Sequence, residues 1–175
     1  MAGAAVGFQS GNWKIRLGHY VGLRNKVEKR QITDLDYSVT SAALFRYFDL
    51  SADEASFYFG VLGAHQPEKM RKSSGYFLRN GNWYRYEDGV VNIDRYKVML
   101  AYGMDIALAG NFRMHFGWGV GLNFRHVWHE APNATLDEDF FNETLILPKG
   151  TRAGRSILPS LHLDFGLIYI IGRKN

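Results

Sequence analysis

Cysteine is absent from this 175-residue chain, and only four residues are proline. Without cysteine the protein has no disulfide framework and no zinc site built on thiolates. No run of 18 apolar residues occurs, which excludes a transmembrane α-helix. Apolar residues make up 46% of the chain and charged residues 22%, a balance that can bury a core and argues against disorder. The length suggests one domain, residues 1–175.

Residues 112–128 alternate between two kinds of side chain. Because successive side chains of a β-strand point to opposite faces, this period of two predicts a strand with one aromatic and aliphatic face and one charged or small face. The first face carries Phe112, Met114, Phe116, Trp118, Val120, Leu122, Phe124, His126 and Trp128, and the second carries Arg113, His115, Gly117, Gly119, Gly121, Asn123, Arg125 and Val127.

The same alternation predicts strands over residues 3–8, 13–24, 37–48, 55–65, 96–107 and 157–169. In the segment 37–48 we expect Val39, Ala43, Phe45 and Tyr47 to point outward. The connections 9–12, 49–54 and 108–111 are short, whereas 25–36, 66–94 and 129–155 are long and polar. Within the second long connection, residues 75–91 are expected to form a small hairpin. Short turns at one end and long loops at the other are typical of an outer-membrane barrel.

Two classes of barrel use alternating strands with opposite orientation. A soluble lipocalin-like carrier turns its apolar face inward around a ligand, whereas a membrane barrel turns that face toward lipid. The length of the apolar face in 112–128, the three inward glycines and the aromatic residues near strand ends favour the membrane class. We therefore expect lipid-facing side chains at Phe112, Phe116, Trp118, Leu122, Phe124, Leu161, Leu163 and Phe165, and interfacial aromatic side chains at Trp13, Tyr47, Tyr96, Trp128 and Tyr169.

The segments Gly-Trp-Gly-Val-Gly-Leu-Asn-Phe at 117–124 and Leu-His-Leu-Asp-Phe-Gly-Leu-Ile-Tyr at 161–169 resemble small OmpA/OmpX-like outer-membrane β-barrels. They are particularly similar to the uncharacterised "outer membrane beta-barrel" families of Gram-negative bacteria. The resemblance implies an all-β, antiparallel, up-and-down transmembrane barrel in the bacterial outer membrane. The chain departs from the pattern by ending in Ile-Gly-Arg-Lys-Asn rather than in an aromatic residue.

The number of predicted strands is odd. A bacterial barrel of this kind has an even number, with both termini in the periplasm. We therefore expect eight strands, of which the first is absent from this sequence. The alternative is a strand within residues 66–94 that the pattern does not reveal.

Charged side chains on the inward faces are expected to form a network of ion pairs in the barrel lumen, because buried charges must be paired. An alternative is a positive lumen that attracts anions. The residues of this predicted network are Lys14, Arg16, Arg46, Lys97, Asp105, Arg113, His115, Arg125, His162 and Asp164.

Catalytic chemistry finds little support in the sequence. Ser160, His162 and Asp164 share a strand face, but same-face neighbours lie roughly 6.6 Å apart, too far for direct proton transfer. His126, His129 and Glu130 are better explained as interfacial polar residues than as metal ligands. We expect no catalytic residue, metal or cofactor, although an outer-membrane lipid-modifying enzyme remains an alternative.

The long loops are the expected contact surface, because loops on a rigid scaffold commonly carry recognition. Loop 66–94 is the leading candidate, with Tyr76, Phe77, Trp83, Tyr84 and Tyr86. The expected partners are outer-membrane lipid, lipopolysaccharide and other envelope proteins. Basic residues that could contact lipopolysaccharide phosphate are Lys26, Lys29 and Arg30 in one loop and Lys69, Arg71 and Lys72 in another. Nucleic-acid binding is not expected, because the positive charge is divided between lumen and loops.

Overall fold

The computed structural model describes residues 2–22, 32–48, 55–137 and 153–171. Within these ranges the regular structure consists of ten β-strands in two antiparallel sheets, which confirms the predicted all-β class. No helix in the described ranges is long and apolar enough to cross a membrane.

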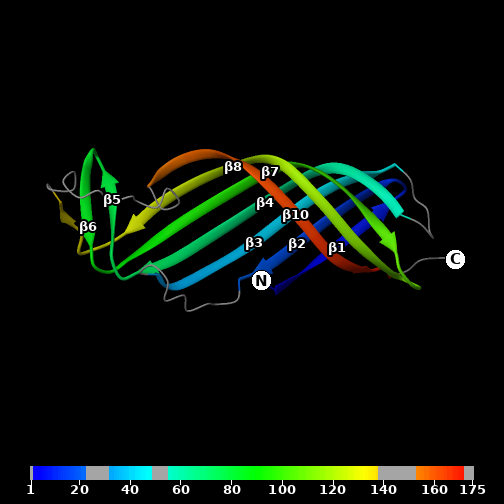
Figure 1. The fold of residues 1–175 in the computed structure, drawn as a ribbon, viewed down its shortest axis with the longest axis horizontal. Helices are drawn as coiled ribbons and strands as arrows, with labels where there is room; N and C mark the ends of the chain where they lie inside the picture. Colours follow the sequence, from blue (N-terminus) through cyan, green and yellow to red (C-terminus); the bar gives the residue numbers. More distant parts are fainter. Residues whose placement is uncertain (1, 23–31, 49–54, 138–152, 172–175) are drawn as a thin grey trace.

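The larger sheet contains seven strands that follow one another around the sheet in chain order. Each strand pairs antiparallel with the next, which confirms the up-and-down topology. Figure 1 shows these strands side by side and inclined to the long axis, with β10 crossing in front of β1–β3 as the sheet curls. In order, the strands are β1 (Ala2–Ser10), β2 (Trp13–Val21), β3 (Ile32–Tyr47), β4 (Ala55–Lys72), β7 (Gly89–Ala107), β8 (Phe112–Glu130) and β10 (Gly154–Tyr169).

Several strands extend beyond their predicted ends. β4 continues to Lys72 and β7 begins at Gly89, so most of the predicted loop 66–94 consists of strand. Between them lies the predicted hairpin, formed by β5 (Gly75–Arg79) and β6 (Asn82–Tyr86). Asn80 and Gly81 both have positive φ, as a tight hairpin turn requires. The two residues of β9 (Thr135–Leu136) complete a second, three-stranded sheet, which we call the surface hairpin sheet.

The β1–β2 and β7–β8 turns lie at the end of the molecule opposite the surface hairpin sheet (Figure 1). Gly11 and Gly110 have φ of 54° and 57° in the β1–β2 and β7–β8 turns, a region that favours glycine. The predicted turn 49–54 and much of the predicted loops 25–36 and 129–155 lie outside the described residues.

The predicted orientation of β3 is wrong. Phe45 and Tyr47 are 1% and 2% exposed, and register pairs Phe45 with the inward-facing Lys14. Arg46 therefore lies on the outer face, where its guanidinium stacks on Trp13 at 5.7 Å. Both faces of this segment carry apolar side chains, so local alternation could not fix its phase. The pairing register with β2 and β4 determines which side chains of β3 point inward.

Two separate apolar clusters are buried inside the curled sheet. The lower cluster, toward the short turns, is centred on the Phe45 and Tyr58 rings, which lie 4.6 Å apart. The upper cluster lies toward the long loops and consists of Met70, Val91, Ile93 and Val127. Apolar side chains therefore occur on both faces of the curled sheet.

Candidate functional site

The outer face of the large sheet carries a belt of exposed apolar side chains, which we call the apolar belt. On β7 the belt runs from Tyr96 to Ile106, and Leu100 in its middle is 53% exposed. Ten residue steps cover roughly 33 Å along a strand, which is about 23–27 Å of height at a tilt of 35–45°. This height matches the apolar band of an outer-membrane barrel, about 25 Å.

All eight residues predicted to face lipid lie in the apolar belt. Their exposure ranges from 40% at Phe124 to 72% at Leu163. Polar residues replace apolar ones immediately above the belt, where register aligns Asp94, His126 and Arg155 on three neighbouring strands. These outer residues are Phe112, Phe116, Trp118, Leu122, Phe124, Leu161, Leu163 and Phe165.

Four of the five predicted interfacial aromatic side chains lie on the outer face. Trp13 and Tyr169 occupy the short-turn end and are 50% and 58% exposed. Tyr96 stacks on His65 at the upper edge of the belt, with ring centroids 4.5 Å apart. Trp128 lies higher and donates a hydrogen bond to Glu130. Tyr47 is the exception, because it points into the lumen.

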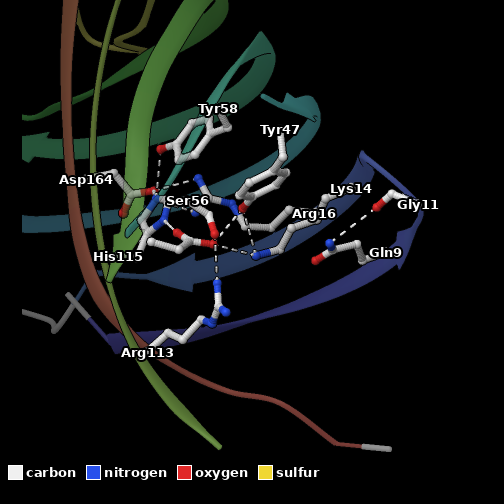
Figure 2. A network of polar contacts seen from close by, with 11 residues as sticks. Gln9, Gly11, Lys14, Arg16, Tyr47, Ser56, Tyr58, Arg113, His115 and Asp164 are labelled. Carbon is white, nitrogen blue, oxygen red and sulfur yellow. Dashed lines mark hydrogen bonds and ion pairs between the residues drawn. The ribbon is translucent and has the colours of Figure 1, made fainter. Parts of the chain in front are cut away.

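A polar network fills the lumen near the short turns (Figure 2). At its centre, Asp105 Oδ1 lies 2.6 Å from His115 Nδ1. The other carboxylate oxygen accepts hydrogen bonds from Tyr47 Oη at 2.6 Å and from Lys14 Nζ at 3.2 Å. Asp105 and His115 are 2% and 3% exposed, so these contacts replace water for nearly the whole carboxylate.

Arg16 joins this network to β10. Its guanidinium contacts Asp164 Oδ2 at 2.5 Å and His115 Nε2 at 2.9 Å. Tyr58 Oη also reaches His115 Nε2, at 3.2 Å. Gly117 makes room for this hydroxyl, because a Cβ there would lie 2.3 Å from Tyr58 Oη. The glycine on β8 is thus needed for close approach, which agrees with its expected place on the crowded inner face.

A second polar group lies higher in the lumen. Arg95 donates a hydrogen bond to Glu68, and Lys97 donates one to Gln66 at 3.0 Å. Arg125 faces the same space, because register places it directly opposite Arg95. Three cations therefore share this level with Glu68.

The structure divides the predicted lumen network into these two groups. Lys14, Arg16, Asp105, His115 and Asp164 meet in the lower group. Arg113 lies beside them and donates a hydrogen bond to Ser56. Lys97 and Arg125 belong to the upper group. His162 is on the inner face of β10, between Ser160 and Asp164, and only Arg46 lies outside the lumen.

Glu68, Arg95 and Tyr47 are lumen residues that the sequence did not reveal, and Tyr58 is a lumen residue that the predicted network did not include. Glu68 and Arg95 fall within the predicted loop 66–94, whose side chains do not alternate between apolar and polar. Tyr47 looks like an interfacial residue by type. The signal that identifies them is cross-strand register, since Tyr47 pairs with Tyr58 and Gln66 pairs with Arg95.

The surface hairpin sheet packs on the long-loop end of the large sheet through aromatic rings. Phe77 lies 5.5 Å from Tyr84 and 5.4 Å from His129 between ring centroids. Tyr86 is 2% exposed, and its burial raises the pKa of the phenol to about 12. Two glycines leave room for this side chain, because a Cβ at Gly75 would lie 2.3 Å from Tyr86 Oη and a Cβ at Gly89 would lie 2.8 Å from the Tyr86 ring.

The predicted recognition residues lie on two faces of this sheet. Phe77, Tyr84 and Tyr86 share the face that contacts the large sheet, because register pairs Phe77 with Tyr84 and Gly75 with Tyr86. Tyr76 and Trp83 lie on the opposite face, with Arg85.

An exposed ion pair links β4 to the turn between β6 and β7. The Arg71 guanidinium donates two hydrogen bonds to Asp88, at 3.2 Å and 2.8 Å. These bonds hold the pKa of the Asp88 carboxyl below its usual range.

The three residues considered as a catalytic triad do not assemble into one. Asp164 binds Arg16 and lies 3.3 Å from His115 rather than serving His162. His126 and His129 lie on opposite faces of β8, as their sequence parity requires. Among the described residues, no group of three His, Cys, Asp or Glu side chains is placed to hold a metal ion.

The fold and these sites define an antiparallel, up-and-down β-sheet protein of barrel type, with an apolar exterior and a polar and aromatic interior. No family model and no curated protein matches the chain. Its structure is similar to the crystal structure of CarO from Acinetobacter baumannii, with a TM-score of 0.48 and 12% sequence identity. The alignment covers 97% of this chain and 92% of CarO. At this level the similarity carries no argument about function.

Proposed function

We propose that this chain is an integral protein of the bacterial outer membrane, a non-enzymatic single barrel domain with a structural or recognition role. The observation that carries the proposal is the apolar belt. Soluble proteins rarely expose contiguous apolar patches above a few hundred Å², and larger ones mark contact with lipid or a partner. A belt that crosses neighbouring strands at the height of a bilayer core fits lipid.

The distribution of charge supports the same reading. Arg16, Asp105 and Asp164 point inward, whereas Leu100, Trp118 and Leu163 point outward. A soluble carrier of an apolar ligand needs the reverse arrangement, with its apolar face around an enclosed cavity. The lower lumen instead holds ion pairs and aromatic rings in contact.

The interior also argues against a transport channel. The lower polar network and the Phe45–Tyr58 cluster occupy the lumen toward the short turns. The upper apolar cluster occupies it toward the long loops, beneath the surface hairpin sheet. An eight-stranded barrel leaves an interior that side chains fill. We therefore place the activity on the outside of the barrel and on its loops.

The surface hairpin sheet is the proposed recognition element. Its outward face carries Tyr76, Trp83 and Arg85, and a cavity of about 610 Å³ beside it is lined by Arg85, Asp88 and Asn133 among others. Aromatic rings and arginine are the side chains most often used in protein recognition. We propose other envelope proteins as its partners.

Lipopolysaccharide is the proposed lipid partner. Lys69 and Arg71 lie on the outer face of β4 above the apolar belt, and Arg155 lies on the outer face of β10 at the level of His126 and Asp94. Cationic side chains at this height can contact phosphate on neighbouring lipid. Lys26, Lys29 and Arg30 lie outside the described residues.

Two measurements test the proposal. The purified chain, refolded with vesicles, should float with them through a density gradient and stay bound after a high-salt or alkaline wash. Folded barrels also migrate differently on a gel before and after boiling. Monodisperse protein in buffer without detergent, with no partition into vesicles, would refute the membrane assignment.

A further inference from the structure

The turn between β6 and β7, residues 87–88, lies between two cavities at the long-loop end of the molecule. The first cavity has a volume of about 490 Å³ and borders the outer side of β3 and β4, where Asp34 and Arg71 are register partners. The second has a volume of about 610 Å³ and lies beside the surface hairpin sheet. Glu87 and Asp88 line both cavities, which therefore adjoin each other across the turn.

The walls of the two cavities are held in place by strand pairing and by an ion pair. Arg71 on β4 donates two hydrogen bonds to Asp88, at 3.2 Å and 2.8 Å, and so ties the turn to the large sheet. On the other side, Arg85 on β6 is the register partner of Thr135 on β9. Both cavities therefore exist in the protein before any ligand arrives, as binding sites usually do.

Polar side chains make up nearly all of the lining that the described residues provide. Sites for apolar ligands are lined mainly by hydrophobic and aromatic side chains, whereas Tyr86 is the one aromatic residue in the described lining. Guanidinium groups only donate hydrogen bonds and carboxylates only accept them, but the Asn133 amide and the hydroxyls of Ser73 and Thr135 do both. A ligand that matches this lining must carry many groups that both donate and accept, and hydroxyl groups meet this requirement.

The charge of the lining argues against an anionic ligand. Among the described residues, three carboxylates (Asp34, Glu87 and Asp88) share the two cavities with two guanidinium groups (Arg71 and Arg85). The excess of one negative charge repels phosphate and carboxylate groups. A bound metal ion is not indicated either, since no group of three His, Cys, Asp or Glu side chains in the described ranges is placed to hold one. The lining therefore selects a neutral ligand rich in hydroxyl groups, which is the chemistry of a sugar.

The height of the first cavity above the apolar belt follows from β4. Val61 on this strand pairs in register with Leu100 near the middle of the belt, and Arg71 lies ten residues further along. Ten residue steps cover roughly 33 Å along a strand, which is about 23–27 Å of height at a tilt of 35–45°. Half the thickness of a bilayer with its headgroups is about 20–22 Å. Arg71 and the cavity beside it therefore stand just above the headgroup region, where the sugars of a glycolipid begin.

We propose that the two cavities bind neutral sugars in the oligosaccharide chain of a neighbouring lipopolysaccharide molecule. This inference rests on the proposed outer-membrane location and gives the lipid partner a second contact. Its acyl chains lie against the apolar belt, its phosphate lies near Lys69, and its sugar chain continues upward into the cavities. Two adjoining cavities suit consecutive sugars of one chain. Among the described residues, Tyr76 and Trp83 line neither cavity, so recognition of envelope proteins through those rings uses different side chains.

The first experiment measures sugar binding by the full chain, refolded in a detergent without a sugar headgroup. The probe is core oligosaccharide, released from lipopolysaccharide by mild acid and dephosphorylated, and the readout is isothermal titration calorimetry. Asn133→Ala removes an amide from the second cavity and should weaken binding roughly 5-fold to 10-fold, the loss expected for one neutral hydrogen bond. Asn82→Ala is the matched control, because Asn82 begins β6 beside the hairpin turn, and it should bind like the parent. No binding by the parent, or equal affinity in all three proteins, would overturn the proposal.

The second experiment separates a neutral sugar from an anion. Glu87→Gln keeps the size of the side chain that faces both cavities but removes its charge. This substitution should weaken binding of the oligosaccharide, because hydrogen bonds to a charged acceptor are the stronger ones. Tighter binding in Glu87→Gln, or displacement of the oligosaccharide by millimolar inorganic phosphate, would show an anion site and overturn the proposal.

Vesicles that contain lipid A separate the sugar contact from the membrane contact, because lipid A carries the acyl chains and phosphates without the core sugars. The parent and Asn133→Ala should insert into these vesicles equally well. Insertion of the parent without any binding of the oligosaccharide would refute the sugar site and leave the membrane location standing. Failure of the parent to insert would instead refute the proposed function, so the two failures are distinguishable.

Discussion

The substitution Leu100→Arg tests the apolar belt most directly. Leu100 lies near the middle of the belt on β7, with Val61 and Val120 as its register partners on either side. It is 53% exposed and points away from the lumen, so the substitution creates no cavity and breaks no polar contact. Its effect therefore reports on the medium around the barrel.

The expected cost follows from placing a guanidinium near the centre of the bilayer. An arginine at the midplane of a membrane barrel destabilises it by about 2–4 kcal/mol. Since 1.4 kcal/mol is a factor of ten, the folding equilibrium should fall by roughly 30-fold to 1,000-fold. In water, the same exposed substitution should change stability by no more than about 0.5 kcal/mol.

The measurement is reversible denaturant unfolding in vesicles, followed by tryptophan fluorescence. Leu136→Arg is the matched control, because it is the same substitution on a strand at a side chain of similar exposure, 48%. Leu136 differs in belonging to the surface hairpin sheet, outside the apolar belt. We expect the control to remain within about 0.5 kcal/mol of the parent. Equal, small losses in both variants would refute the lipid-facing assignment.

Three further predictions concern the lumen and the surface hairpin sheet. Asp105→Asn should lower the free energy of unfolding by about 3–5 kcal/mol, because Lys14 keeps a buried charge without its partner. Asp88→Asn, which removes an exposed ion pair, is the control and should leave the midpoint of denaturant unfolding nearly unchanged. Gly117→Ala should displace the Tyr58 hydroxyl that reaches His115 and should lower the Tm. Gly166→Ala is the control, because a Cβ there meets nothing within 4 Å, and it should leave the Tm unchanged. An equal Tm in the two variants would contradict the packing of Tyr58 against Gly117. The raised pKa of Tyr86 stabilises the docked hairpin fully below pH 10, and this contribution is lost as pH rises through about 12. Amide exchange accelerates with pH even in an unstructured chain, so the quantity to measure is the protection relative to that intrinsic rate. Protection in β5 and β6 should fall across that range, and Tyr86→Phe should abolish this fall; an unchanged pH profile of protection in that variant would refute the assignment.

Much of the fold could be predicted because the alternation of side chains within a single strand shows which residues share a face. In residues 112–128 one set of side chains is aromatic or aliphatic and the other is charged or small, so the division into outer and inner faces needs no knowledge of neighbouring strands. Gly11 and Gly110 lie in two of the predicted short connections, 9–12 and 108–111, where a tight turn needs the positive φ that glycine adopts. These features depend only on residues close together in the chain.

The candidate site was only partly predictable, because its contacts join residues far apart in sequence. Asp105, His115 and Arg16 were assigned to the lumen individually, but their meeting depends on how far the sheet curls. The Glu68–Arg95 pair was hidden because β4 and β7 continue into a stretch whose polar side chains look like a loop.

The sequence by itself determined that the seven strands of the large sheet exist, their order and the outer position of most apolar side chains, because these follow from a period of two. The upper parts of β4 and β7 lack that period and were not predicted. Only the tertiary structure decided the phase of β3, where Ala42 and Leu44 compete with Ala43 and Phe45 for the same interior. Pairing with β2 places Phe45 beside Lys14, which sends Tyr47 to Asp105 and leaves Arg46 on Trp13. Register is a relation between strands, and no single strand contains it.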